Sequence, residues 1–439
     1  MLRHQKIYFG CVIYQRMKEM LNAIGIKSID ELFELPDEIK CRIDLPSPMN
    51  EMDVEHEIVA MMEKNRTFYE MPSFLPILKP HYIPAIVDEI VARQEFYTSY
   101  TPYQAEASQG MLQALFEYQS IVAELTGMEV ANASMYDGAT ALGEAALMAN
   151  RIKKRGGIAI PECMYEAKKQ VLKNYAKGVG IKIYEMPCYN GLPELKNHAS
   201  IDAIYVENPN FYGIIERRQD EIIDAAEKSD ALIIVGSDPL FLSIYNPPEY
   251  ADIVIGEGYL GNYMNFGGPL LGIFACKRKY LRHMPGRIIG ATVDKEGKRA
   301  FTMTLQTREQ HIRRGKATSN ICSNEALCAI AFLAYVAALG RNGLRRIALK
   351  NKENAHYMAK QLEKIGFELP FKDFFNEFLA ISPVNASMLN KKLLEYGIQN
   401  GMLIEKPSNS ILYGVTEMHS KELIDRAIEK IKMAMEALS

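Results

Sequence analysis

The chain has 439 residues, well beyond the roughly 100 to 150 residues of an ordinary domain, so we expect two or three packed units. Hydrophobic residues make up 48% and charged residues 24% of it, a globular composition that excludes global disorder. Its 51 basic and 54 acidic residues leave a net charge of −3. A chain with so little net charge has no strong positive electrostatic potential to attract phosphate groups and release their counterions. We therefore expect no nucleic-acid partner.

The apolar runs and the cysteines bear on the cellular compartment. The longest apolar stretches, such as Ala329–Leu339, fall short of the roughly 20 residues that cross a bilayer, so we expect no membrane association. The seven cysteines are scattered, odd in number and without a CxxC pair, which is typical of reduced thiols in the cytoplasm. The eight histidines form no HxxxH or CxxH pattern, and this predicts no metal site.

In chain order, residues 1–99 predict a helical N-terminal segment, with helices at 29–33, 53–65 and 84–98. Residues 100–340 predict a large α/β domain, because short apolar runs alternate with amphipathic helices as in a mostly parallel sheet covered on both faces. Residues 341–439 predict a small α+β domain. The large domain has predicted strands at 158–160, 181–185, 203–206, 231–235, 253–255 and 270–275, and predicted helices at 111–125, 139–154, 165–177, 219–228, 304–314 and 323–339.

Asp238 follows the apolar run ALIIV, which places it at the carboxyl edge of the predicted sheet, where ligands bind. A carboxylate at that edge can protonate a pyridine nitrogen, as in pyridoxal-phosphate enzymes. The alternative is that Asp238 only caps the turn before Pro239. A second candidate is the predicted helix start at Asp137 and Gly138, whose free amides would bind an anion. Simple capping by Asp137 is an equal alternative.

The window from Ser229 to Cys276 contains no lysine. A pyridoxal-phosphate enzyme needs a lysine amine to hold its cofactor as a Schiff base, normally downstream of the ring-binding aspartate. The first lysine after the window, Lys277, follows a predicted buried strand and resembles a solvated strand end. The sequence therefore argues against a Schiff base on this chain.

Two polar tracts are further candidates for a site. The tract TREQHIRRGKATSN forms a positive patch that suits a phosphate or carboxylate, although a solvated helix face is an equal alternative. The tract YTPYQAEASQ is rich in tyrosine and glutamine, and it is either a site loop or a buried polar loop. The candidate residues are Arg308, His311, Arg313, Arg314, Thr318, Ser319 and Asn320 in the first tract, and Tyr100, Thr101, Tyr103 and Gln104 in the second.

Several long motifs together resemble one family: YTPYQAEASQG, FEYQSIVAELTGMEVANASMYDGATALGEA, FGGPLLGIFA, MPGRIIGATVD and TLQTREQHIRRGKATSNIC. They are similar to the N-terminal subunit of the two-subunit glycine decarboxylase, the P-protein of the glycine cleavage system. The resemblance extends from about residue 19 to the C-terminus, whereas residues 1–15 depart from the family pattern. It implies the aspartate-aminotransferase-like fold of fold-type I pyridoxal-phosphate enzymes.

The resemblance also implies a partner of the same fold, subunit 2 of glycine decarboxylase in an α2β2 complex, which carries the Schiff-base lysine and pyridoxal phosphate. In this family glycine loses its carboxylate as carbon dioxide, and its aminomethyl group passes to the lipoyl arm of the H-protein. The present chain would then complete the active site at the subunit interface.

On this reading each candidate residue has an expected role. The tyrosine loop, with Tyr100, Thr101, Tyr103 and Gln104, would line the glycine pocket. Thr318, Ser319 and Asn320 would face the partner's phosphate. The basic tract, with Arg308, His311, Arg313 and Arg314, would contact an anion or the carrier protein. Asp137, Gly138 and Asp238 would be a vestigial pocket. Two alternatives stay open: a self-sufficient pyridoxal-phosphate enzyme that uses Lys277, and a non-catalytic scaffold.

Overall fold

The computed structural model describes residues 15–33, 36–39, 41, 45–196, 198, 200–321 and 325–438. By packing, the chain divides into two compact units, Met1–Asn65 and Arg66–Ser439. The predicted domain boundaries at 99/100 and 340/341 lie inside the second unit and stay predictions. In the first unit no described residue is buried. Its elements are a helix over residues 15–24, the short 3-10 helices η1 (Ile29–Leu32) and η2 (Asp37–Ile39), and α2 (Glu51–Met62).

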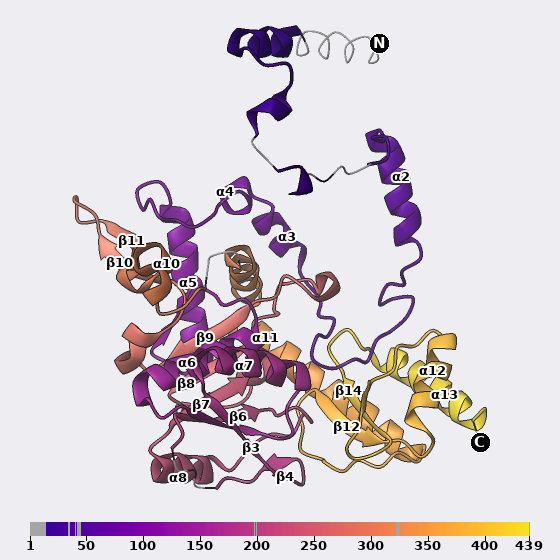
Figure 1. Ribbon diagram of the computed structural model, residues 1–439. Coiled ribbons are helices and arrows are strands. Elements are labelled where there is room, and N and C mark those ends of the chain that lie inside the picture. The colour runs from indigo at the N-terminus through magenta and orange to yellow at the C-terminus, as the bar shows by residue number, and fades with distance from the viewer. Residues whose placement is uncertain are drawn as a thin grey trace. The chain divides into compact units, whose positions relative to one another are not determined.

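A seven-stranded sheet forms the centre of the second unit, in the order β1-β9-β8-β7-β6-β2-β3 (Figure 1). The strands from β8 to β3 are parallel, whereas β9 runs antiparallel to β8 and β1 antiparallel to β9. This arrangement confirms the predicted mostly parallel sheet. The strands are β1 (Val130–Ala131), β2 (Gly157–Pro161), β3 (Lys182–Met186), β6 (Ala203–Asn208), β7 (Leu232–Ser237), β8 (Ile253–Glu257) and β9 (Gly272–Cys276).

Helices cover both faces of this sheet, because side chains of a buried strand point alternately to opposite sides. In β7, Val235 packs into an apolar cluster with α5, α8 and α11, and Ile234 packs into a second cluster with α6 and α7. The helices of this layer are α5 (Gln109–Thr126), α6 (Gly138–Lys153), α7 (Glu166–Val179), α8 (Gln219–Ser229), α9 (Pro239–Leu242) and α11 (Ala326–Lys364), with 3-10 turns η3 (Asn265–Gly267) and η4 (Arg278–His283).

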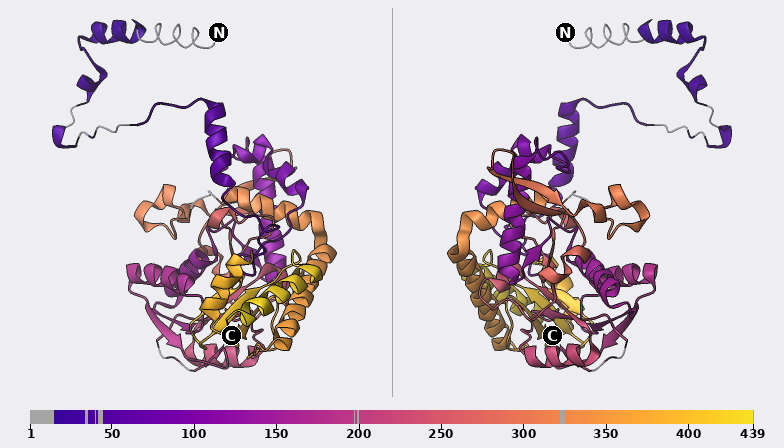
Figure 2. Two further views of the ribbon diagram at one scale, coloured as in Figure 1. Left: turned by 90° about the vertical axis from the view of Figure 1, so that its right-hand side faces the viewer. Right: turned by 90° about the vertical axis from the view of Figure 1, so that its left-hand side faces the viewer.

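The helix α11 joins the helix predicted at 323–339 to a second helical stretch that lies in the predicted small domain. They meet at a kink at Gly340, where φ is 60° and a side chain would be strained. Figure 2 shows α11, in orange, running past the large sheet to the C-terminal helices. Among the helices of the described residues, α11 alone is long and apolar enough to span a membrane by length and composition. Nearly half of its apolar window, 44%, is buried inside this chain, as in a core helix.

The C-terminal part has its own antiparallel sheet, in the order β12-β14-β13, packed against two helices. A third apolar cluster, which includes Phe378, Leu389 and Ile431, fills the space between them. This confirms the α+β character predicted for the last hundred residues. The elements are β12 (Glu377–Ile381), α12 (Ala386–Glu395), β13 (Met402–Ile404), β14 (Ser410–Gly414) and α13 (Lys421–Glu436).

Two predicted helices are wrong as continuous elements. The predicted helix at 304–314 begins at the last residue of β11 and is then broken into the short helices η5, α10 and η6, which follow Leu305, where φ is 53°. The hairpin of β10 and β11 precedes it, and Phe301 and Met303 of that hairpin pack into the cluster of α5. The predicted helix at 84–98 is interrupted at Arg93. The observed elements are α3 (Ala85–Val91), α4 (Gln94–Tyr97), β10 (Ile288–Val293), β11 (Arg299–Thr304), η5 (Gln306–Arg308), α10 (Gln310–Arg313) and η6 (Arg314–Lys316).

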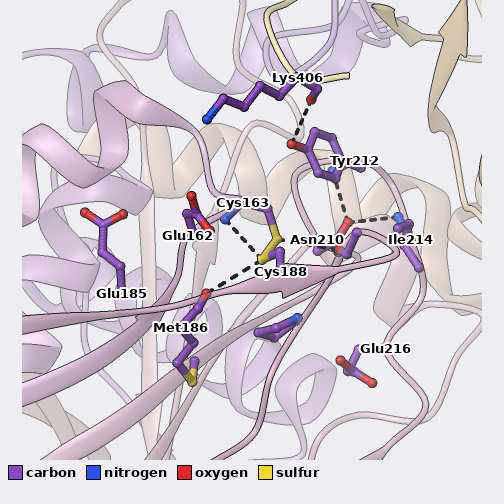
Figure 3. Close-up of a disulfide and its surroundings, with 12 residues drawn as sticks. Glu162, Cys163, Glu185, Met186, Cys188, Asn210, Tyr212, Ile214, Glu216 and Lys406 are labelled. Atoms are coloured by element: carbon purple, nitrogen blue, oxygen red, sulfur yellow. Dashed lines mark hydrogen bonds between the residues drawn. A yellow bond between two sulfur atoms is a disulfide. The ribbon is translucent and has the colours of Figure 1, made fainter. Parts of the chain in front are cut away.

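Cys163 and Cys188 form a disulfide, so the prediction of reduced thiols is wrong for this pair (Figure 3). The bond ties the loop after β2 to the small hairpin of β4 (Cys188–Tyr189) and β5 (Leu192–Pro193). A sequence spacing of 25 residues gave no sign of this contact, because chain folding alone decides which cysteines meet. Cys41, Cys276 and Cys328 are free thiols, and Cys11 and Cys322 lie outside the described residues.

Candidate functional site

A cavity of about 150 Å³ lies at the carboxyl edge of the parallel strands, where ligands bind in open α/β sheets. Its walls include Glu207 in β6, Asp238 directly after β7 and Glu257 at the end of β8. Gly138, the first residue of α6, forms another wall. The sheet therefore brings together the three residues that the sequence predicts as a vestigial pocket, since Asp137 immediately precedes Gly138.

Two amides at the start of α6 already donate to carboxylates. The Gly138 N–H donates to Glu257 Oε2 at 2.8 Å, and the Thr140 N–H donates to Asp137 Oδ1 at 2.7 Å in a capping box. Burial raises the pKa of Glu257 to about 7, against the lowering effect of the bond from Gly138. A phosphate at this helix start would have to displace one carboxylate and lie beside another.

The ring-binding carboxylate is occupied as well. Asp238 accepts the Leu240 and Phe241 N–H groups at 2.8 and 3.1 Å, which is the capping role that the sequence left open. The Tyr259 hydroxyl also lies 2.9 Å from both of its carboxylate oxygens. His81 stacks on the Tyr259 ring, with centroids 4.8 Å apart and planes 18° apart. Asp238 thus already has partners where a pyridine nitrogen would have to approach it.

Among the described residues, no lysine that lines this cavity is without an ion-pair partner. Lys79 and Lys168 line it, but each is held in an ion pair of 2.7 Å, with Glu377 and Glu207 respectively. Lys277 lies at the opposite edge of the sheet, because β9 is antiparallel and its end pairs with the start of β8. The residues of this cavity therefore do not fit pyridoxal phosphate.

A second group of predicted residues converges away from this cavity, on Arg287. One guanidinium nitrogen of Arg287 donates to the Tyr103 hydroxyl at 3.0 Å, and its Nε lies 3.2 Å from Glu309 Oε2. The His311 ring contacts the Tyr103 ring edge-on, with centroids 5.0 Å apart. The tyrosine loop and the basic tract, two separate candidates in the sequence, thus form one cluster.

The tract from Thr318 to Asn320 borders both groups. The Thr318 N–H donates to the Arg308 carbonyl at 2.9 Å, and the Ser319 hydroxyl accepts the Gly286 N–H at 3.2 Å. Tyr136, which lies just before α6, has its hydroxyl 3.4 Å from the backbone oxygen of Asn320. Thr318 and Ser319 are half-buried, and Asn320 is exposed.

The basic residues of the tract have different environments. Arg308 is buried, where it donates to the carbonyl oxygens of Met284 and Gly286, and burial lowers its pKa. Its charge therefore holds a loop and is not presented to a carrier protein. Arg313 and Arg314, in contrast, are exposed.

The other residues of the tyrosine loop lie at or near the surface. Tyr100 and Gln104 are exposed, and Thr101 is half-buried. The sequence alone predicts no role for Arg287, Glu309, Glu257 or Tyr259. The first two stood inside motifs that the resemblance quotes, which was the available signal. The last two carried no local signal, because their role depends on which strand ends meet.

Comparison with known proteins adds the following. The family described as glycine cleavage system P-protein matches residues 10–431. A Sulfurisphaera tokodaii protein named probable glycine dehydrogenase (decarboxylating) subunit 1 is 45% identical over 435 residues, which is 95% of this chain and 96% of that protein. A crystal structure of glycine decarboxylase (P-protein) of the glycine cleavage system, in inhibitor-bound form, matches with a TM-score of 0.90 and 40% identity over 96% of this chain and 98% of that one.

A more distant structure shows the breadth of the fold. The sphingosine-1-phosphate lyase of Burkholderia pseudomallei matches over 91% of this chain and 93% of its own, with a TM-score of 0.63 and 15% identity. At that identity the likeness concerns the fold alone. The fold is that of the fold-type I pyridoxal-phosphate enzymes, as the resemblance implied.

Proposed function

Since the chain belongs to the glycine cleavage system P-protein family, we propose that it is the subunit of a two-subunit glycine decarboxylase that lacks the Schiff-base lysine. One observation carries this proposal. In the cavity at the carboxyl edge, Gly138 and Asp238 already bond to Glu257 and Tyr259 of the same chain, and the nearest downstream lysine, Lys277, lies at the other edge. A self-sufficient enzyme that uses Lys277 would need a different sheet.

In this proposal the partner, subunit 2, holds pyridoxal phosphate covalently, and the two chains form an α2β2 complex in the cytoplasm. The cofactor supplies the electron sink that lets glycine lose its carboxylate as carbon dioxide. The lipoyl group of the H-protein accepts the aminomethyl group. The present chain contributes binding and orientation at the interface, and no bond is made or broken on its own side chains.

The tyrosine loop is proposed to line the glycine pocket at that interface, through Tyr100, Thr101, Tyr103 and Gln104. Because Arg287 donates to the Tyr103 oxygen, the hydroxyl proton of Tyr103 points toward another acceptor, and a glycine carboxylate is a suitable one. Thr318, Ser319 and Asn320 are proposed to face the partner's phosphate. The exposed His311, Arg313 and Arg314 are proposed to contact an anion or the acidic surface of a carrier protein.

The first unit gives independent support for a partner subunit. Many of the large apolar side chains in its described residues are exposed, including Met52, Ile58 and Met62 of α2. Apolar surface of this kind marks sites of association in soluble proteins. A second protein chain that covers this surface would remove the cost of exposing it to water.

The proposal is tested by cofactor trapping. The purified chain is incubated with pyridoxal phosphate, treated with borohydride and digested for peptide mapping, alone and with the partner subunit. We expect label on the partner and none on this chain in either case. Stoichiometric label on any lysine of this chain in the absence of the partner would refute the assignment.

A second experiment separates an active-site contribution from a scaffold role. In the reconstituted complex, Tyr100→Phe and Tyr103→Phe should each lower the exchange of the glycine carboxylate with carbon dioxide by about tenfold without splitting the complex. Tyr189→Phe, at an exposed tyrosine of the β4–β5 hairpin, is the matched control. Full exchange activity in both loop variants, or in the partner alone, would favour the scaffold alternative.

A further inference from the structure

Arg287 contacts residues of both converging tracts, Tyr103 in the tyrosine loop and Glu309 in the basic tract. It lies immediately before β10, and it reaches a tyrosine 184 residues earlier in the chain. Its guanidinium carbon also lies 5.5 Å from the centroid of the Tyr103 ring, so the charge interacts with the ring face as well as with the hydroxyl. Only 10% of the Arg287 side chain and 9% of the Glu309 side chain are exposed, and their pairing is therefore shielded from solvent.

The backbone that carries Arg287 is fixed on both sides. The Ala133 N–H donates to the Arg287 carbonyl at 2.8 Å, and the buried Arg308 donates to the Gly286 carbonyl at 2.8 Å. Gly286 has a φ of 71°, and a Cβ atom there would lie 2.9 Å from the Asn132 amide nitrogen. The loop is thus held in one conformation before the Arg287 side chain leaves it.

The side chains beyond Arg287 are more exposed than it is. Tyr103 is 49% exposed, and the His311 side chain is 34% exposed, 3.7 Å from the carboxylate of Glu309. Neither ring is held by deep burial. Their orientation therefore depends on the Arg287 and Glu309 pair beneath them, which contacts Tyr103 through Arg287 and His311 through Glu309.

We propose that Arg287, paired with Glu309, is a positioning residue that holds Tyr103 and His311 in one orientation at the subunit interface, with Tyr103 directed toward the substrate. This inference rests on the proposed function, which places Tyr103 at the glycine pocket. Arg287 acts through Tyr103: it orients the hydroxyl and, by donating a charge-assisted hydrogen bond, makes the phenolic proton a stronger donor toward a carboxylate. A lysine has no planar fork and cannot bond to Glu309 and Tyr103 in the same geometry.

The test is a double-mutant cycle in the reconstituted complex with Arg287→Lys, Tyr103→Phe and the double variant. If Arg287 acts through Tyr103, each single variant should lower kcat/KM for glycine by about tenfold. The kcat/KM of the double variant should then be no lower than that of the less active single variant. Arg299→Lys, at an exposed arginine on β11, is the matched control. Effects that multiply in the double variant would overturn the proposal.

A second readout does not depend on activity. Hydrogen exchange of the peptides covering residues 98–108 should become faster in the isolated Arg287→Lys chain and stay unchanged in Arg299→Lys. Unchanged exchange would overturn the positioning role even if Tyr103→Phe lowers turnover. Conversely, full activity of Tyr103→Phe with faster exchange in Arg287→Lys would refute the site assigned to Tyr103 and leave the positioning contact intact.

The melting temperature of each variant separates misfolding from misplacement. Should Arg287→Lys fail to fold, Glu309→Gln is taken through the same cycle with Tyr103→Phe. That variant keeps the shape of the side chain and removes the charge opposite Arg287, and it carries the same expectation of non-additive loss and faster exchange. Additive loss or unchanged exchange in Glu309→Gln would again overturn the proposal.

Discussion

At the scale of single residues, Glu144 has a buried carboxyl group whose two oxygens are not both hydrogen-bonded within the described part of the chain. It lies in α6, and its Oε2 has no hydrogen-bond partner among the described residues. Burial raises its pKa to about 7, although the charge of Arg151 lowers it, and the nearby Tyr175 hydroxyl is neutral. The unfolded chain titrates near the ordinary value of 4.5. Between these two values the folded state binds more protons, so this group contributes stability below pH 4.5 that is lost as the pH rises through 7.

Glu144→Gln should therefore raise the free energy of unfolding at pH 8, by at most about 3 kcal/mol, and change it little at pH 4.5. The measurement is urea unfolding of both proteins at the two pH values. Glu429→Gln, at an exposed glutamate of α13, controls for the loss of a carboxylate in general. An equal effect at both pH values would contradict the burial account.

Arg308 gives a second residue-scale prediction, because its buried guanidinium bonds to two backbone carbonyls. Arg308→Met keeps much of the apolar length and leaves those carbonyls unpaired, so we expect a loss of about 2 to 4 kcal/mol in the free energy of unfolding. The exposed Arg313→Met should lie within about 0.5 kcal/mol of the wild type. Denaturant midpoints of the two variants decide the matter, and similar midpoints would contradict a structural role for Arg308.

At the scale of elements, the disulfide closes a loop of the chain that includes α7 and β3. In Figure 3 the bond between Cys163 and Cys188 lies beside Asn210. Asn210 in turn donates to the Gly191 carbonyl at 2.7 Å, so the hairpin has a second attachment that does not depend on sulfur. Reduction should therefore lower stability without unfolding the hairpin.

From its loop of about 25 residues, the disulfide should contribute about 3 kcal/mol, mainly by restricting the unfolded chain. Addition of dithiothreitol should lower the melting temperature of the wild-type chain. The Cys163→Ser, Cys188→Ser double variant should melt at the reduced value with or without the reagent. If the reagent lowers the melting temperature of the double variant equally, the effect comes from somewhere else.

At the scale of the whole molecule, the two units differ in what holds them. The unit from Arg66 onward has three apolar clusters, whereas the described residues of the first unit bury nothing. A segment without a core gains little from folding alone. Its helices are therefore expected to gain their packing from a second protein chain, and the proposed partner subunit is the candidate.

Ile58→Glu in α2 should weaken binding of the partner subunit by about tenfold or more and leave the melting temperature of the isolated chain unchanged. Titration calorimetry with the partner measures the first quantity and scanning calorimetry the second. Met433→Glu, at a similarly exposed apolar residue of α13, is the matched control. Equal affinity of the wild type and Ile58→Glu would exclude this face of α2 from the interface.

The sequence by itself determined the alternating α/β plan, the small α+β end and the absence of a lysine between Asp238 and Cys276. These are properties of local periodicity and composition, and they need no knowledge of which segments meet. The quoted motifs also determined the family, because similarity over long motifs can be recognised from the sequence without a structure. Capping by Asp137 and Asp238 was foreseen as an alternative for the same reason, because a cap acts on its own chain neighbours.

Only the tertiary structure decided the rest. Strand direction placed Lys277 at the far edge of the sheet, and the meeting of strand ends brought Glu257 to Gly138 and Tyr259 to Asp238. The packing of distant segments brought Arg287 to a tyrosine 184 residues earlier in the chain and brought Cys163 to Cys188. Contacts of this kind depend on sheet order and register, which are set by the packing of the whole core, and no local pattern of residues records them.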